Sequence, residues 1–307
     1  VRCVLFQTVD LEKEDIKIMR KNNLFKKTVA AGLVLLMTAS LAACDGKKTD
    51  TKTEDKKTET KAGKEEDVEL QVFIAASLSK VMDEVATEYQ KDHPNVKITF
   101  NADSSGTLLT QIEEGYACDV FFSAAQKQMN QLDKDADPEV NTEGLDYVLE
   151  GTRINLLENK VVLAVPDGNP KGIESFADLG TDKLSLLALG NEDVPVGQYS
   201  EEILTNLGML DQLEQENKIT YGSNVKEVTT QVSEAAADAG IIYATDAYSA
   251  GLPVVAQADD TMCKQVIYPA AVLNISENQD AAEAFLDYLK TDDCMKVFEE
   301  VGFTAVK

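Results

Sequence analysis

Two serines stand where a predicted strand gives way to a predicted helix. Ser77 follows the apolar run 70–75, and Ser105 lies in the segment 103–107, which reads DSSGT. The first N–H groups of a helix have no acceptor within the helix, and they carry the positive end of its dipole. Two such helix starts that face one crevice can bind an anion without a cationic side chain. Gly106 would let the anion approach the backbone closely. The ordinary alternative is that each hydroxyl only caps its own helix.

The second half of the chain offers similar positions. Residues 193–199 form a turn that leads into a helix, and Val225 opens another helix after Asn224. Tyr243 ends the short apolar strand 240–243, where its phenol is able to donate a hydrogen bond into the crevice. A plain core tyrosine is the alternative interpretation of Tyr243.

These positions require sheets that bring several helix starts to one edge. Apolar runs alternate with helical spacings along residues 70–132, and a second series of strands and helices runs from 160 to the C-terminus. This order predicts an α/β fold of two lobes, each a mostly parallel sheet flanked by helices, joined by hinge strands. Residues 68–157 with 265–307 form the predicted lobe 1, and residues 158–264 form lobe 2. Ligands of such sheets bind beyond the C-terminal ends of the strands.

The N-terminal region is predicted to be an export signal. A basic run from Arg20 to Lys27 precedes the uncharged segment 28–43, which is shorter than the ~20 residues of a membrane-spanning helix. Residues 1–43 therefore form the signal region, and Met19 is the expected true start. Residues 44–67 begin with Cys44 and continue as a Lys-, Thr- and acid-rich tether that cannot bury a core.

Composition excludes several classes of function. The chain has 29 Lys and Arg against 54 Asp and Glu, and one histidine. A nucleic-acid partner is not expected, because phosphate contacts need clustered cations, and His-rich zinc sites are excluded. No cofactor and no direct metal ligand are expected. Cys118 is expected to be a buried thiol, Cys263 and Cys294 are a candidate disulfide pair, and the odd count leaves at least one thiol free.

Five motifs in order resemble the molybdate-binding lipoproteins of molybdate ABC transporters, which belong to the two-lobed periplasmic-binding-protein class, type II. The motifs are AASL at 75–78, SSGTL at 104–108 with DVFFSA at 119–124, VPVGQY at 194–199, GIIYATDA at 240–247, and YP at 268–269 with GF at 302–303. The sequence LAAC at 41–44 is similar to a lipobox. The resemblance implies that Cys44 carries lipid, that the protein is anchored on the extracytoplasmic face of the cell membrane, and that its partners are a permease and an ATPase. A monomer is expected.

The same resemblance implies the ligand set. Ser77 and Ser105 would each give a hydroxyl and a backbone N–H, Val196 and Val225 a backbone N–H, and Tyr243 its phenol. The implied ligand is molybdate or tungstate. Hydrogen bonds to charged groups contribute about 1.5–3 kcal/mol each, so seven donors give a gross gain of about 10–20 kcal/mol. A site made only of donors disfavours hydrogen phosphate, whose O–H needs an acceptor.

Three alternatives remain open at this point. The first is a receptor for another tetrahedral oxyanion such as sulfate, because the sequence does not give the cavity radius. The second is an extracytoplasmic enzyme that acts on an oxyanion ester, although no basic residue lies near Ser77 or Ser105 in the sequence. The third is a lipoprotein adhesin with a degenerate pocket.

Overall fold

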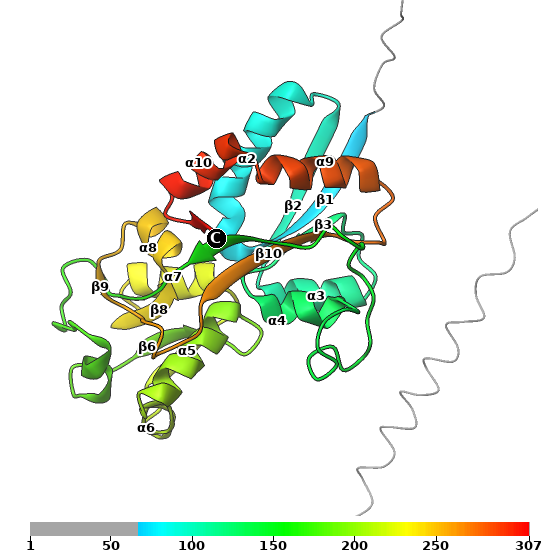
Figure 1. The fold of residues 1–307 in the computed structure, drawn as a ribbon. Coiled ribbons are helices and arrows are strands. Elements are labelled where there is room, and N and C mark those ends of the chain that lie inside the picture. The colour runs from blue at the N-terminus through cyan, green and yellow to red at the C-terminus, as the bar shows by residue number, and fades with distance from the viewer. Residues whose placement is uncertain (1–66, 307) are drawn as a thin grey trace, which may run out of the picture. The chain divides into compact units, whose positions relative to one another are not determined.

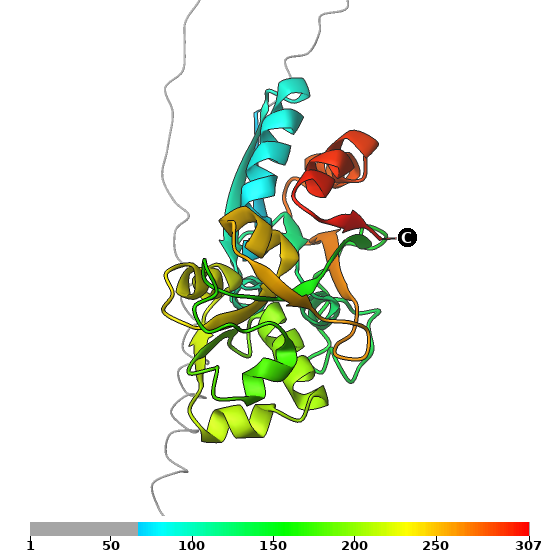
Figure 2. The ribbon, with the colours of Figure 1, turned by 90° about the vertical axis from the view of Figure 1, so that its left-hand side faces the viewer.

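The chain forms two α/β lobes around two separate sheets (Figure 1). The structure is a computed structural model that describes residues 67–306. The predicted signal region, Cys44 and almost all of the tether lie outside these residues. In Figure 2, lobe 1 occupies the upper part of the view and lobe 2 the lower part. No helix within residues 67–306 is long and apolar enough to cross a membrane.

Lobe 1 is built on a six-stranded sheet, counted within the described residues, with the order β11-β4-β10-β3-β1-β2. Its strands are β1 (Val68–Ala75), β2 (Val96–Asp103), β3 (Val120–Phe122), β4 (Ile154–Asn159), β10 (Val266–Val272) and β11 (Thr304–Ala305). β1 pairs in parallel with β2 and β3, whereas β10 runs antiparallel to both β3 and β4. The last two strands of the chain, β10 and β11, therefore complete the sheet that the N-terminal strands begin.

Lobe 2 is built on a five-stranded sheet within the same range, with the order β7-β6-β8-β5-β9. Its strands are β5 (Val161–Ala164), β6 (Leu187–Gly190), β7 (Ile219–Gly222), β8 (Ala239–Tyr243) and β9 (Val254–Gln257). β6 pairs in parallel with β7 and β8, and β5 pairs antiparallel with β8 and β9. The chain changes sheet at Lys160, between β4 and β5, and again between β9 and β10.

Helices cover both sheets. In lobe 1, α2, α9 and α10 lie on one side of the sheet and α3 and α4 on the other (Figure 1). The helical elements are η2 (Ala76–Leu78), α2 (Ser79–Asp92), α3 (Ser105–Glu113), α4 (Gln126–Leu132), η3 (Phe176–Gly180), α5 (Pro195–Asn206), α6 (Leu210–Gln215), α7 (Val225–Ser233), α8 (Ala244–Ala250), α9 (Gln279–Leu289) and α10 (Asp292–Glu300). Helices η2, α3, α5 and α7 each begin directly beyond a strand end or after a short turn, so their N-termini reach the same edge of the sheets.

The prediction of two α/β lobes is confirmed, but the prediction of mostly parallel sheets is wrong. Five of the nine strand pairs are antiparallel. The reason is the way in which the chain passes between the lobes. β4, β5, β9 and β10 lead into or out of the connections at Lys160 and 258–265, and each pairs antiparallel with its neighbours.

Three cysteines of the described chain are free and buried. Cys263 and Cys294, the candidate pair, are not joined. Burial raises the pKa of the Cys263 thiol to about 11 and that of Cys294 to about 12. Cys118 is 2% exposed, as expected of a buried thiol.

Candidate functional site

Ser105 does not cap its helix. Ser104 is the N-cap of α3, and its hydroxyl oxygen accepts the N–H of Thr107 at 3.1 Å. Ser105 is the first helical residue and is fully buried, and its Oγ accepts the backbone N–H of Ala124 at 3.0 Å. The interpretation of Ser105 as a mere cap is therefore wrong. Because its oxygen accepts from Ala124, its own hydrogen is free for another partner.

Ser77 also makes no capping hydrogen bond. It is the middle residue of η2, and neither η2 nor α2 has a side-chain cap. Its Oγ lies 2.9 Å from the phenol oxygen of Tyr268, a residue of β10 that is fully buried. The backbone N–H of Ser77 lies in the first turn, where a helix has no acceptor of its own.

Two helices of lobe 2 direct N–H groups toward the same region. Pro195 occupies the first position of α5 and has no N–H, so Val196 supplies the first backbone donor of that helix. The N–H groups of Gly197 and Gln198 both bond to the carbonyl of Val194. In α7, the Asn224 side chain caps the helix and Val225 is the first helical residue. Both valine side chains are buried.

Tyr243 ends β8 with its ring 1% exposed. Its phenol donates a long hydrogen bond of 3.5 Å to the carbonyl of Ala124 in lobe 1. Burial, followed by the neighbouring Tyr268 and Tyr199, raises the pKa of Tyr243 well above its ordinary value. The phenol therefore stays protonated at neutral pH and remains a donor. Tyr243 is both a core residue and a residue with a polar tip directed across the gap between the lobes.

The structure brings all five residues named from the sequence to one small cavity between the lobes. The cavity has a volume of about 10 Å³, close to the minimum that holds one water molecule. Pockets for drug-sized ligands are ~300 Å³ or larger, so this cavity suits only a compact solute of few atoms. The lining residues are Ala75, Ala76, Ser77, Asp103, Ser104, Ser105, Ala124, Val194, Pro195, Val196, Val225 and Tyr243.

The charge of the lining is unusual for an anion site. No lysine, arginine or histidine belongs to the lining, and Asp103 is its single carboxylate. One oxygen of Asp103 accepts the Ser104 N–H at 2.8 Å and the Asn224 amide at 3.2 Å. The site is thus a set of uncharged donors with one acceptor at its rim, which differs from the donor-only site expected from the sequence. Within residues 67–306 no cluster of three or more His, Cys, Asp or Glu side chains could hold a metal ion.

The two lobes touch each other around this cavity. The N–H of Gly106 donates to the carbonyl of Asp193 at 3.0 Å, and the Asn224–Asp103 hydrogen bond forms a second bridge. A Cβ at residue 106 would overlap the Asp193 carbonyl oxygen and would lie 2.9 Å from its Cα. The expected role of Gly106 in admitting the anion is therefore corrected, because its missing side chain makes room for the backbone of the opposite lobe.

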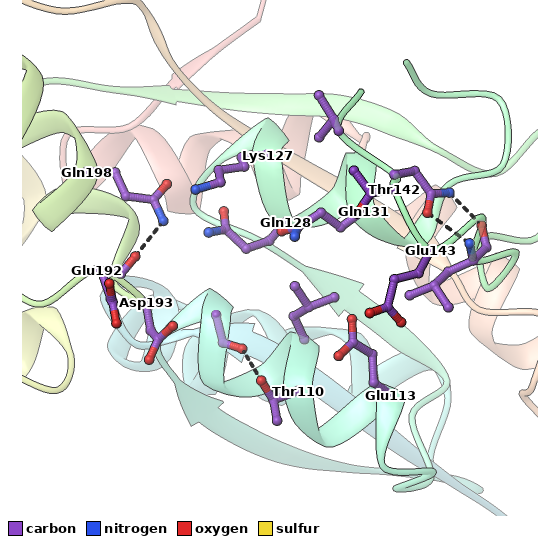
Figure 3. A pocket seen from close by; sticks show the side chains of 15 residues that line it. Thr110, Glu113, Lys127, Gln128, Gln131, Thr142, Glu143, Glu192, Asp193 and Gln198 are labelled. Carbon is purple, nitrogen blue, oxygen red and sulfur yellow. Dashed lines mark hydrogen bonds between the residues drawn. The ribbon is translucent and has the colours of Figure 1, made fainter. Parts of the chain in front are cut away.

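A larger cavity of about 310 Å³ lies beside the small one and is lined by both lobes (Figure 3). Four carboxylates line it, from Glu113, Glu143, Glu192 and Asp193, against one Lys127. The Glu113 and Glu143 carboxylates point toward each other (Figure 3), and burial together with the charge of Glu143 raises the pKa of Glu113. Four carboxylates against one lysine make this larger cavity unfavourable for an anion.

Neither site serine has a basic partner. The hydrogen bonds of their side chains go to Tyr268 and to the Ala124 N–H, whereas a nucleophilic hydroxyl needs a base beside it. Two lobes that meet around a small cavity at helix N-termini form the arrangement of a receptor that encloses a small ligand.

Comparisons with known proteins agree with this class. The family model described as bacterial extracellular solute-binding protein matches residues 70–304, and the chain belongs to this family of transport receptors. A Bacillus subtilis protein that carries the provisional name ABC transporter substrate-binding lipoprotein YvgL is 32% identical over 92% of this chain and 100% of its own length. The molybdate-binding protein ModA of Escherichia coli K12 is 35% identical over 76% of this chain and 88% of its own. The structure of the Azotobacter vinelandii periplasmic molybdate-binding protein aligns with a TM-score of 0.67 over 78% of this chain and 100% of its own, at 22% identity.

Family membership implies an extracellular receptor that works with ABC transporter components. The sequence reasoning missed several residues that shape the site. Tyr268 contacts Ser77, and Asn159, Asn224 and Asp193 each make a hydrogen bond between the lobes. Tyr268 was part of a matched motif, but only the folded chain places it against Ser77, which lies 191 positions earlier.

Proposed function

We propose that the protein binds molybdate, or tungstate, in the small cavity between its lobes and delivers it to an ABC permease. Ser77, Ser105, Val196, Val225 and Tyr243 are the proposed ligands. The observation that carries the proposal is the convergence of these five residues, from both lobes, on one enclosed space without a cation. Their hydroxyls and N–H groups can replace the hydration shell of a tetrahedral dianion.

The charge of the exported part supports the use of uncharged donors. Residues 68–307 contain 15 basic and 42 acidic residues, a net charge of −27. An anion can still bind, because hydrogen bonds at contact distance outweigh diffuse surface charge that salt screens beyond about 10 Å. Helix N-termini provide such contacts without a counter-ion that would also attract other anions.

The choice of molybdate rests on the relatives that carry this name. Calorimetric titration of the full-length protein with molybdate, tungstate, sulfate and phosphate tests it. We expect heat of binding with molybdate and tungstate and none with sulfate. A preference for sulfate would instead assign the protein to sulfate uptake, and a lack of binding to all four anions would favour an adhesin.

We further propose that Cys44 is lipidated and holds a monomeric receptor on the extracytoplasmic face of the cell membrane. The acidic domain would be repelled by an anionic membrane, so lipid must provide the attachment, and stable anchoring takes at least two acyl chains. A permease and an ATPase are the proposed partners, and no nucleic acid is. Cys44→Ser should release the protein from the membrane fraction.

Removal of either site hydroxyl should weaken anion binding. Ser77→Ala is expected to lower molybdate affinity about tenfold or more, since one hydrogen bond to a charged group contributes about 1.5–3 kcal/mol. Ser105→Ala should lower the affinity by a similar factor, and it should also destabilise the folded protein, because it leaves the buried Ala124 N–H without its acceptor. Titration calorimetry measures both changes. Ser79→Ala is the control, because the Ser79 hydroxyl bonds to the Ala76 carbonyl and does not line the cavity. If Ser77→Ala and Ser105→Ala bind molybdate as tightly as Ser79→Ala and the wild type do, the proposed site is wrong.

A further inference from the structure

A chain of buried hydrogen bonds lies behind Ser77. The phenol oxygen of Tyr268 is 2.9 Å from Ser77 Oγ, and Asn159 Nδ2 donates to this phenol oxygen at 3.2 Å. The same Nδ2 donates to Thr245 Oγ1 at 2.9 Å. Asn159 is 2%, Tyr268 0% and Thr245 2% exposed, so water does not substitute for these partners.

The backbone N–H of Lys160 fixes which atom of each hydrogen bond is the donor. Asn159 Oδ1 accepts the N–H of Lys160 at 2.8 Å. A backbone N–H can only donate, so the carbonyl oxygen of the amide must face Lys160 and the NH₂ group must face the two hydroxyls. The two hydrogens of Nδ2 are then used by Tyr268 and Thr245.

The same order of donors and acceptors extends from Asn159 through Tyr268 to Ser77, which lines the cavity. Two groups bond to the phenol of Tyr268, namely Asn159 Nδ2 and Ser77 Oγ. An amide NH₂ only donates, so Ser77 Oγ is the one of these two that can accept the buried Tyr268 hydrogen. The oxygen of Ser77 accepts that hydrogen, and its own hydrogen points away from Tyr268, on the side of the cavity that Ser77 lines. Ser105 is oriented in the same sense by the Ala124 N–H. Both serines thus present hydrogens, not lone pairs, to the cavity.

We infer that Asn159 is a positioning residue that sets the polarity of the anion site through Tyr268. This inference rests on the proposed function. Its consequence is selectivity: an oxyanion that carries a proton, such as hydrogen phosphate, would meet a hydrogen at Ser77 where it needs an acceptor. Asn159 ends β4 at the point where the chain changes sheet, and its bond to Thr245 in α8 reaches the opposite lobe. The residue that orients Ser77 therefore also contacts both lobes.

The test uses the full-length protein with Asn159→Leu, Tyr268→Phe, Ser77→Ala and the double variant N159L/S77A. Each is titrated with sodium molybdate, sodium sulfate and sodium phosphate at pH 8, where phosphate carries one proton. We expect N159L and Y268F to lower the ratio of molybdate to phosphate affinity about tenfold, because Ser77 can then turn its lone pairs to the ligand. In the S77A background, N159L should have no further effect on that ratio. Asn155→Leu, at an exposed position on the same strand, is the matched control and should bind as the wild type does.

The outcomes separate the two claims. If the wild-type protein binds none of the three anions, the proposed function fails and this inference fails with it. If the wild type binds molybdate and both N159L and Y268F keep its molybdate-to-phosphate ratio, only the inference on Asn159 is overturned. The inference is also overturned if N159L lowers the molybdate-to-phosphate ratio equally with and without the Ser77 hydroxyl. Asn159 would then not act through Ser77. Y268F keeps the ring in the core, so the test stands even if N159L does not fold.

Discussion

An alanine at position 106 is expected to lower anion affinity about 100-fold or more, although Gly106 contributes no side chain to the ligand. In the closed arrangement, a Cβ at this position would overlap the carbonyl oxygen of Asp193 in the opposite lobe. The contact involves backbone on both sides, so no side chain can turn away to relieve it. The lobes would have to stay apart, and the donors of lobe 1 and lobe 2 could not reach one anion together.

The free protein should tolerate this change. Gly106 lies in the first turn of α3, where its φ is not in the left-handed region, so alanine suits the local backbone. We therefore expect Gly106→Ala to keep its unfolding temperature without ligand and to lose affinity in calorimetry. In small-angle X-ray scattering, we expect molybdate to reduce the radius of gyration of the wild type and not that of the variant.

Gly180→Ala is the matched control for this variant. Its new Cβ would lie 3.6 Å from the Met209 side chain, an ordinary contact inside lobe 2. The control should bind like the wild type. If Gly106→Ala also binds and compacts like the wild type, then the Gly106–Asp193 contact is not required for closure, and the lobes enclose the anion in another way.

Local sequence patterns indicate some features of the segment Ser104–Gly106 and not others. The strand-to-helix transition was visible because apolar runs and helical spacing are local, and it led to Ser105. The exact residue at which the helix begins decides which of the two adjacent serines is the cap. In the structure, the cap is Ser104. The neighbour of Gly106 is Asp193, which is 87 positions later, so no local pattern indicated it.

The sequence patterns did not predict strands β4, β7, β9 and β11, and the reason is again physical. β4, β7 and β9 alternate polar and apolar residues weakly, and β9 and β7 lie at the edges of their sheet, where burial is incomplete. Their pairing depends on the strands beside them. The hydrogen bonds from Asn159 to Tyr268 and Thr245 span 109 and 86 positions, and they exist only after both lobes have formed.

Asp246 is expected to make the protein less stable as the pH rises from about 4 to 7. It lies in the first turn of α8, 8% exposed, and its Oδ2 has no hydrogen-bond partner. Burial raises its pKa from 3.8 to about 7, and the charge of Lys226 on α7 opposes this only in part. The phenols of Tyr243 and Tyr268 also face it, and the Asp246 charge raises the pKa of both.

The sign follows from proton binding. Below pH 4 the carboxyl is protonated in both the folded and the unfolded chain, so it contributes no difference. Between pH 4 and 7 the folded chain keeps the proton and the unfolded chain loses it, so the free energy of unfolding falls as pH rises. Above pH 7 both forms are ionised and the loss is complete. The pKa difference corresponds to about 4 kcal/mol at most.

Asp246→Asn should remove this loss, because an amide of the same shape carries no charge. Urea unfolding at pH 4.5 and pH 8 measures the difference, and we expect the variant to gain stability over the wild type only at pH 8. The exposed Asp259 is the control, since hydrogen bonds from Thr261 lower its pKa, and Asp259→Asn should bring no such gain. The charge of Asp246 raises the pKa of Tyr243, which lines the cavity, so an ionised Asp246 should also repel a bound dianion. The wild type should therefore bind molybdate more weakly at pH 8 than at pH 6. If the wild type and Asp246→Asn have the same dependence of stability on pH between 4.5 and 8, this prediction is wrong. Asp246 would then already be ionised and solvated in the folded protein at pH 5.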